Sequence, residues 1–112
     1  MSKFVINGQC WRLKYVSSHD RHLVDRTGVP TLGTTDPRFH RLYLCKELDY
    51  YTRKRVLMHE LSHCVMISYG LIEKLHIYVR PEYWFEAEED LCNFIVDYSE
   101  EIQHITSQLM YN

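Results

Sequence analysis

Apolar residues are densest between Val56 and Ile67, and there they do not follow a single stripe. On a helical projection this stretch has apolar side chains on three sides: Val56 and Ile67 on one, Leu57, Leu61 and Cys64 on another, and Met58 and Val65 on a third. A helix that is apolar around its whole circumference is a buried helix. The pattern therefore predicts a core helix in the middle of the chain.

The flanking residues indicate where this helix begins and ends. Asp49 or Thr52 can cap its first turn, because their side-chain oxygens can accept a hydrogen bond from a free backbone N–H group. Gly70 can end it in a left-handed turn. We expect the helix to cover residues 52–69. Its first turn carries the basic residues 53–55, which the helix dipole disfavours.

A second long helix is predicted over residues 86–109. Its apolar residues recur every three or four positions, which places them along one side of a helix. The members of this stripe are Ala87, Leu91, Phe94, Ile95, Tyr98, Ile102, Ile105 and Leu109. The stripe continues for several turns beyond the needs of a minimal core, so it could bury against a second copy of the chain or a regulator.

The remaining apolar runs are short and typical of strands. Residues 4–6 and 9–16 flank an Asn-Gly pair, which predicts a β-hairpin. We expect extended segments at 31–35 and 75–81, and a strand at Arg41–Cys45 directly before the central helix. That strand is either a sheet edge beside the helix, able to accept an extended peptide, or a strand that only fills the core.

These elements predict an α+β fold in one domain, residues 1–112. A short antiparallel or mixed sheet would pack on the central helix, and the second long helix would follow. A chain of 112 residues is long enough for one modest core.

Composition narrows the choice of partners and compartment. The formal net charge is −2 and the basic residues are scattered, which favours neither nucleic acid nor a membrane surface as a partner. No run is apolar for long enough to span a bilayer or to serve as a secretory signal, so we expect a cytoplasmic protein with no membrane association. Its four cysteines form no C-x-x-C pair and are expected to be reduced, mostly buried thiols.

Candidate chemistry lies within the central helix, as the motif H-E-x-x-H. His59 and His63 are four residues apart, so both rings lie on one face, where two imidazoles can bind one metal ion. Glu60 lies beside that face, where a carboxylate can act as a general base without being a ligand. Burial of these polar groups without partners would be costly, and a zinc ion would remove that cost. The alternative is a structural histidine pair that binds no metal.

The other closely spaced histidines, His19 and His22, lie in a polar stretch with no third candidate ligand nearby. We do not expect them to bind metal.

A catalytic zinc ion commonly has three protein ligands and one open position. The pattern H-E-x-x-H-x-x-G-x-x-H is excluded, because Met66 stands at the glycine position and Tyr69 at that of the last histidine. The remaining source is the acidic start of the second helix, with Glu86, Glu88 and Glu89. Carboxylates also favour a helix N terminus for purely electrostatic reasons.

Helical spacing favours Glu89 among these acids. It shares a face with Cys92, Asn93 and Val96, opposite the main stripe, and the small residues of that face would let the central helix approach. Glu88 borders the stripe and remains the alternative ligand. Asn93 follows Glu89 by one turn, where its amide could hold a ligand histidine in place.

At these positions the chain resembles the ImmA/IrrE-type metallopeptidases, small gluzincins that combine H-E-x-x-H with a later E-x-x-A-N-x-F-A. The two motifs correspond to residues 59–63 and 89–96, and the resemblance covers roughly residues 31–98. Cys92 replaces the alanine, and Ile95 and Val96 replace the Phe-Ala pair. We expect no attached helix-turn-helix or sensor domain.

The resemblance implies a small zincin-like fold, as in minimal phage and prophage members. It also implies zinc as the cofactor, bound by His59, His63 and Glu89, with Glu60 as the general base.

The activity that the resemblance implies is that of a zinc-dependent metallo-endopeptidase, a hydrolase whose protein substrate could be a repressor-like regulator. In this interpretation the peptide lies against the strand around Leu42 to Leu44, and Tyr78 or His76 steadies the oxyanion. The alternative is a catalytically silent or latent zinc-containing module, which binds a partner or forms a homodimer.

Overall fold

A computed structural model describes residues 1–111 of the chain. It is an α+β structure with one four-stranded mixed sheet and three α-helices, as the sequence predicted at this level. The elements in chain order are β1 (Ser2–Ile6), β2 (Gln9–Val16), a 3-10 turn (Arg21–Leu23), β3 (Gly33–Asp36), β4 (Arg41–Cys45), α1 (Tyr50–Ser68), α2 (Leu71–Tyr78), a second 3-10 turn (Pro81–Tyr83) and α3 (Trp84–Met110).

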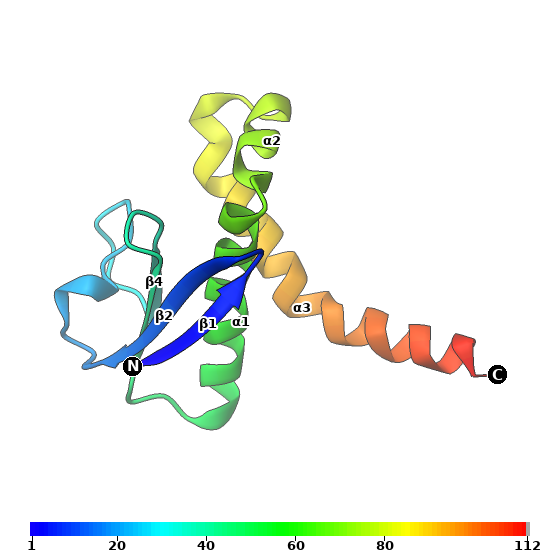
Figure 1. Cartoon of the computed structure of the whole chain (residues 1–112), viewed down its shortest axis with the longest axis horizontal. Coiled ribbons are helices and arrows are strands. Elements are labelled where there is room, and N and C mark those ends of the chain that lie inside the picture. The colour runs from blue at the N-terminus through cyan, green and yellow to red at the C-terminus, as the bar shows by residue number, and fades with distance from the viewer. Residues whose placement is uncertain (112) are drawn as a thin grey trace.

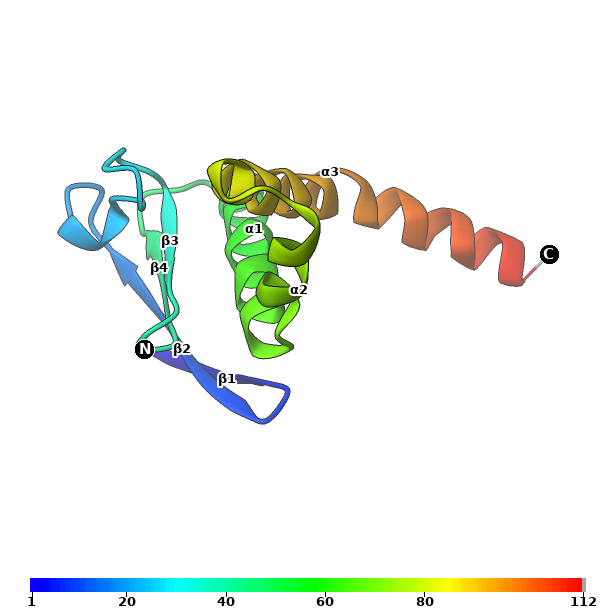
Figure 2. The ribbon, with the colours of Figure 1, turned by 90° about the horizontal axis from the view of Figure 1, so that it is seen from above.

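The helices form a layer beside the sheet. Figure 2 shows the sheet on one side of α1 and α2 on the other, while α3 crosses α1 and then runs away from the body. The same projection of α3 is visible in Figure 1, where its C-terminal end lies far from the strands. The body of the protein is therefore the sheet with α1 and α2, and α3 extends beyond it.

The sheet has the strand order β1-β2-β4-β3. β1 and β2 form the expected antiparallel hairpin, with Ile6 opposite Gln9. Its turn uses left-handed backbone at Asn7 (φ 49°) and Gly8 (φ 75°), the pair of positive angles that a tight type I′ hairpin requires. The hairpin prediction is confirmed.

β4 is an internal strand and not an edge. It pairs in parallel with β2 on one side and antiparallel with β3 on the other. Of the two alternatives predicted for Arg41–Cys45, the sheet edge is excluded, because the chain places the short strand β3 outside it, and the strand that fills the core is the one observed. β3 itself corresponds to the extended segment predicted at 31–35, displaced by two residues at its start.

Two clusters of buried side chains make the core. The larger one joins Trp11 and Leu42 of the sheet to Cys64 of α1, with Leu57 and Leu61 packed against it. The smaller one lies beneath the first 3-10 turn. One apolar side of α1 thus packs as predicted, but Val65 on another side is 39% exposed, so the helix is not buried around its whole circumference.

α1 begins and ends close to its predicted limits. The Asp49 carboxylate accepts a hydrogen bond from the Thr52 backbone N–H at 2.8 Å, and Gly70 follows the last turn with φ 70°. The hairpin holds the far end of the helix, since Trp11 Nε1 donates to Ser68 Oγ at 2.8 Å and Asn7 Nδ2 donates to the Ser68 carbonyl at 3.0 Å.

The segment expected to be extended at 75–81 is instead the helix α2 with its following turn. Leu71, Ile72 and Leu75 recur at helical spacing, and this periodicity prevails over the β-branched character of the later residues. Gly70 permits the sharp reversal that lays α2 against α1.

α3 agrees with the predicted second helix to within two residues at its start and one at its end. α3 forms ion pairs with two basic residues of α1, Lys54 with Glu100 and Arg55 with Asp97. Because α1 begins at Tyr50, these two residues lie in its second turn and not in its first turn as predicted. Among residues 1–111, none of the helices combines the length and hydropathy needed to cross a bilayer.

Candidate metal centre

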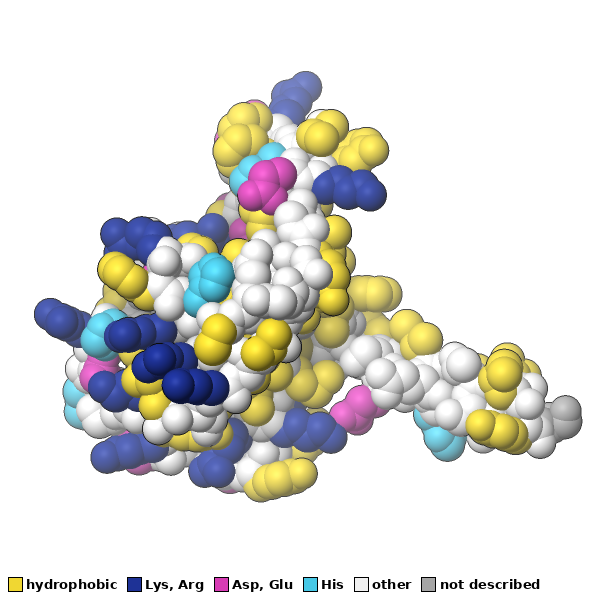
Figure 3. Space-filling view, in the orientation of Figure 1, with side chains coloured by type: hydrophobic (Ala, Val, Ile, Leu, Met, Phe, Trp, Pro, Cys, Tyr) yellow, Lys and Arg dark blue, Asp and Glu magenta, His cyan; other side chains and the backbone are white. Residues whose placement is uncertain are grey.

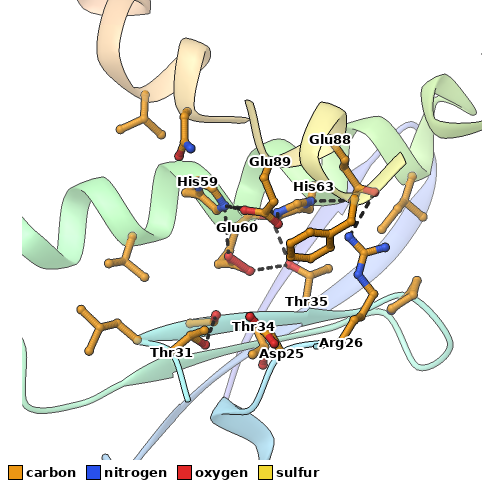
Figure 4. Close-up of a pocket in the computed structure, with 18 of the residues that line it drawn as sticks. Asp25, Arg26, Thr31, Thr34, Thr35, His59, Glu60, His63, Glu88 and Glu89 are labelled. Atoms are coloured by element: carbon orange, nitrogen blue, oxygen red, sulfur yellow. Dashed lines mark hydrogen bonds and ion pairs between the residues drawn. The ribbon is translucent and has the colours of Figure 1, made fainter. Parts of the chain in front are cut away.

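The H-E-x-x-H residues line a cavity of about 660 Å³ between β3 on one wall and α1 and α3 on the other. His59, Glu60 and His63 reach it from α1, and Glu89 reaches it from α3 (Figure 4). The opposite wall is formed by residues 31–35, which include the start of β3. The site therefore lies on the floor of an open cleft.

Three donor groups face one another at the centre of this cavity. His59 Nε2 lies 3.3 Å from His63 Nε2 and 2.8 Å from Glu89 Oε2. The other oxygen of Glu89 lies 3.1 Å from His63 Nε2. Tetrahedral ligands placed at ordinary zinc distances are about 3.3 Å from one another. The spacing of these three groups fits a single ion with little rearrangement.

Glu88 contacts the same histidine from the opposite side. Its Oε1 lies 2.8 Å from His63 Nδ1, and Arg26 Nη2 donates to its Oε2 at 3.2 Å. A carboxylate on Nδ1 fixes the ring and leaves Nε2 to act as a metal ligand. Glu88 and Glu89 therefore do not compete for the central position.

The amide of Asn93 does not hold a histidine. Asn93 lines the cavity, but within the described residues 1–111 no hydrogen bond joins its amide to His59 or His63. The expected orienting role is taken at His63 by Glu88, whose carboxylate contacts Nδ1 of that ring.

Glu60 is buried beside the histidine pair. Its Oε2 lies 4.0 Å from His59 Nε2, and Thr35 Oγ1 donates to its Oε1 at 3.2 Å. Burial raises the pKa of Glu60, and the charges of His63 and His59 and the Thr35 hydroxyl oppose this effect. A carboxyl group with a raised pKa next to a ligand position, outside the central triangle, is suited to accept and return a proton.

The charged side chains of the centre form ion pairs with one another. Burial by itself lowers the pKa of His63, but hydrogen bonds with Cys92, Glu88 and Glu89 outweigh burial and raise that pKa. Hydrogen bonds from His59 and His63 lower the pKa of Glu89. A metal ion would have to displace the proton on His63, since only neutral imidazole binds metal.

The charge around the histidines also suits a divalent cation. The residues that line the cavity include the acids Asp25, Glu60, Glu73, Glu88 and Glu89 and the bases Arg26 and Arg55. With neutral imidazoles this lining carries a formal excess of three negative charges, which favours the binding of a divalent cation.

Cys92 adds a further donor that the sequence analysis treated only as a small residue. His59, His63 and Cys92 offer ligand atoms that all lie within 4.8 Å of one another, and this group could hold a metal ion. The Cys92 side chain is fully buried, and burial raises its pKa. It lies outside the residues that line the cavity, so it approaches the histidines from the protein side.

The two residues suggested as oxyanion donors lie elsewhere. His76 stacks on Trp84 with ring centroids 3.7 Å apart, and Tyr78 is 79% exposed at the end of α2. Neither is among the residues that line the cavity. Both suggestions assumed an extended segment at 75–81. Because residues 71–78 are helical instead, the side chains of His76 and Tyr78 do not reach the cavity.

His22, a partner in the rejected second pair, contacts Asp20 through Nδ1 at 2.7 Å and stacks on Tyr43. It is a structural residue of the first 3-10 turn.

Three contributors were not predicted from the sequence: Arg26, Thr35 and Gly33. Arg26 comes from an irregular loop and Thr35 from a strand that has no motif of its own. Gly33 lets β3 approach α1, because a Cβ there would lie 2.8 Å from Val56 Cγ1 and 3.1 Å from Glu60 Cγ. Only the Gly-Thr-Thr sequence before the site hinted at such a close approach.

Comparisons with protein-family models, with curated proteins and with solved structures found no match.

Proposed function

We propose that this protein is a zinc-dependent metallo-endopeptidase with a zincin-like fold, related to the ImmA/IrrE-type peptidases that its motifs resemble. The observation that carries the proposal is the triangle of His59 Nε2, His63 Nε2 and the Glu89 carboxylate, with sides of 2.8 to 3.3 Å, at the floor of an open cavity. In this proposal, His59, His63 and Glu89 hold the ion.

Zinc, when bound, would acidify a water molecule and polarise the scissile carbonyl group. Glu60 accepts the proton of the attacking water and passes it to the leaving amine, for which its raised pKa is favourable. Thr35 orients Glu60 through the hydroxyl bond at 3.2 Å. Glu88 and Arg26 keep the His63 ring in place from behind.

The substrate in this proposal is an extended peptide that adds to the free edge of β3. Residues 1–111 place only β4 beside β3, and the residues around its start form one wall of the cavity. An unpaired strand edge can hold a peptide by backbone hydrogen bonds, in the manner of β-augmentation. The edge of β3 thus takes the peptide-binding role that was expected of the strand around Leu42 to Leu44, because that strand is paired on both sides. The resemblance suggests a repressor-like regulator as the natural substrate.

The decisive experiment compares wild type with Glu60→Gln after both are loaded with zinc. With an unfolded casein as the probe, we expect the variant to lose activity by about 10²–10⁴-fold, the contribution of a positioned general base. Its zinc content should remain at one ion per chain, because Glu60 is not a ligand. The control is Asp90→Asn, which removes an exposed acid next to Glu89. This variant should retain both the cleavage activity and the zinc content of wild type. Equal cleavage by wild type and Glu60→Gln would overturn the proposal.

A second candidate is a zinc-containing binding module without catalysis. The proximity of Cys92 to both histidines favours it, because a sulfur ligand added to His59, His63 and Glu89 would complete four-coordination and leave no open position. In that case zinc-loaded wild type would cleave no unfolded protein, while its zinc content would remain at one ion per chain.

A further inference from the structure

α3 carries, from Phe94 onward, an apolar face that nothing else within residues 1–111 covers. Phe94, Tyr98 and Ile102 are each more than half exposed, and Leu109 is 72% exposed. In Figure 3 apolar side chains gather along the arm that projects from the body. The radius of gyration is 15.2 Å, against about 13 Å expected for a compact chain of this length.

The spacing of this face is that of a coiled coil. The apolar positions alternate in steps of four and three residues without a break: Leu91, Ile95, Tyr98, Ile102, Ile105 and Leu109. A period of 3.5 residues keeps a narrow seam in register with a neighbouring helix over several turns. A helix that only covers a globular core needs a wider stripe with a period of 3.6. We call these six residues the seam.

The seam points away from the body. Asp97 and Glu100 bind Arg55 and Lys54 of α1, so they mark the side of α3 that faces the body. At 3.6 residues per turn, the centre of the seam lies on the opposite side of the helix from these two acids. A partner on the seam therefore leaves the contacts between α1 and α3 unchanged.

The projecting end also lacks the features that keep an exposed helix in solution. Residues 102–111 contain no Asp, Glu, Lys or Arg. A helical end of this length is only marginally stable in water without tertiary contacts. Burial of the apolar side chains against a partner would supply the missing stabilisation.

We propose that the seam of α3 pairs with the same seam of a second copy, forming a two-stranded coiled-coil dimer. An identical helix has the matching period, and isoleucine at 95 and 102 occupies the positions where β-branched residues favour two strands. The residues that flank the seam over the projecting half are Ser99, Glu101, Thr106 and Gln108. Glu101 is the single charge among them, and in a parallel pair it faces Thr106, so like copies meet without repulsion.

This pairing does not rest on the proposed peptidase activity. The α3 residues that line the cavity, including Glu89, Asn93 and Val96, lie on the side that faces α1, so the dimer leaves the cavity open. Assembly and metal binding can therefore be measured separately.

The test is the molar mass in solution, by sedimentation equilibrium over a wide range of protein concentration. Wild type should have twice the chain mass of 13.6 kDa, and Ile102→Glu/Ile105→Glu should have the mass of one chain. The matched control Gln103→Glu/Ser107→Glu adds the same two charges to the opposite side of the same turns, and it should remain dimeric.

Far-UV circular dichroism shows whether the variants are folded, and it does so independently of metal binding. A wild type that is monomeric at all concentrations, or a folded seam variant that remains dimeric, overturns the proposal. A monomer that instead binds phosphatidylcholine vesicles through the same residues also overturns it. A trimer contradicts the two-stranded arrangement.

Discussion

The carboxylate of Glu88 lies 2.8 Å from Nδ1 of His63, the ring nitrogen that points away from His59. The neighbouring residue Glu89 lies on the other side of the same ring, at Nε2. Two consecutive glutamates on one helix therefore contact both nitrogens of one imidazole, and this division gives them different roles in metal binding.

The first prediction separates these roles. Glu88→Gln should lower zinc affinity about 10–100-fold, the usual effect of removing a group that orients a ligand. Glu89→Gln should lower it further, because the variant loses a ligand. Competition with a chromophoric chelator measures both values, and Asp90→Asn should bind as wild type does. The reverse order of the two effects would make Glu88 the ligand.

The second prediction concerns Cys92. Its thiol is fully buried and burial raises its pKa, whereas the pKa of Glu89 is lowered by its histidine partners. Because Glu89 faces both histidines inside the cavity and Cys92 lies outside its lining, we expect cobalt-loaded wild type to lack sulfur-to-metal charge-transfer absorption. Cys92→Ser and Cys64→Ser should then give the same spectrum. A charge-transfer band that disappears only in Cys92→Ser would support the closed, non-catalytic centre.

The third prediction is a pH shift caused by Thr35. The Thr35 hydroxyl lowers the pKa of Glu60 and partly offsets the effect of burial. Thr35→Val removes this bond, so the pKa of Glu60 rises and the acid limb of the activity profile should move to higher pH. Thr34→Val is the control, because its hydroxyl bonds the His22 carbonyl and not Glu60. An acid limb that stays in place would exclude Glu60 as the group that titrates.

The fourth prediction tests the close approach at Gly33. Gly33→Ala should destabilise the protein by about 1–3 kcal/mol, the typical effect of overpacking a filled interior. The added Cβ would lie 2.8 Å from Val56 Cγ1 and 2.9 Å from Leu44 Cδ2. Urea unfolding measures the change. Val56→Ala added to Gly33→Ala should cost less than the sum of the two single changes, and additive losses would contradict this account.

The fifth prediction concerns acid stability without metal. The folded-state pKa of Glu89 is lowered from the ordinary value of 4.5, so its ion pairs stabilise the fold above pH 4.5 and are lost as the pH falls below it. In the presence of a chelator, the difference in Tm between wild type and Glu89→Gln should therefore shrink below pH 4.5. A difference that stays constant over this range would show that folding does not lower the pKa of Glu89.

The long elements and the central motif could be predicted because they depend on local patterns. Cap residues located α1 and helical periodicity located α3 to within two residues at their starts, and the Asn-Gly pair located the hairpin. The spacing of His59 and His63 by itself places both rings on one face. Neither inference required knowledge of which elements touch.

The remaining features depend on contacts between distant parts of the chain. No local pattern predicts that β3 lies at the edge of the sheet, next to β4. This strand order decides that the free edge belongs to β3 and not to β4. The 71–78 segment has apolar residues at both helical and extended spacing, and its packing on α1 selects the helix. Arg26 reaches Glu88 across 62 positions of sequence, so its role could not be read from its neighbours.

The attachment of Ser68 to Trp11 and Asn7 has a consequence for biosynthesis. These two hydrogen bonds join residues that are 57 and 61 positions apart in the sequence. Glu89 follows its partner His59 by 30 positions. When a nascent chain has left the ribosome only as far as α2, the end of α1 can already form its hydrogen bonds with the β1–β2 hairpin. At that stage the chain still lacks Glu89, the carboxylate of the proposed metal site. Synthesis of α3 would therefore complete the metal site last, after the scaffold around it has formed.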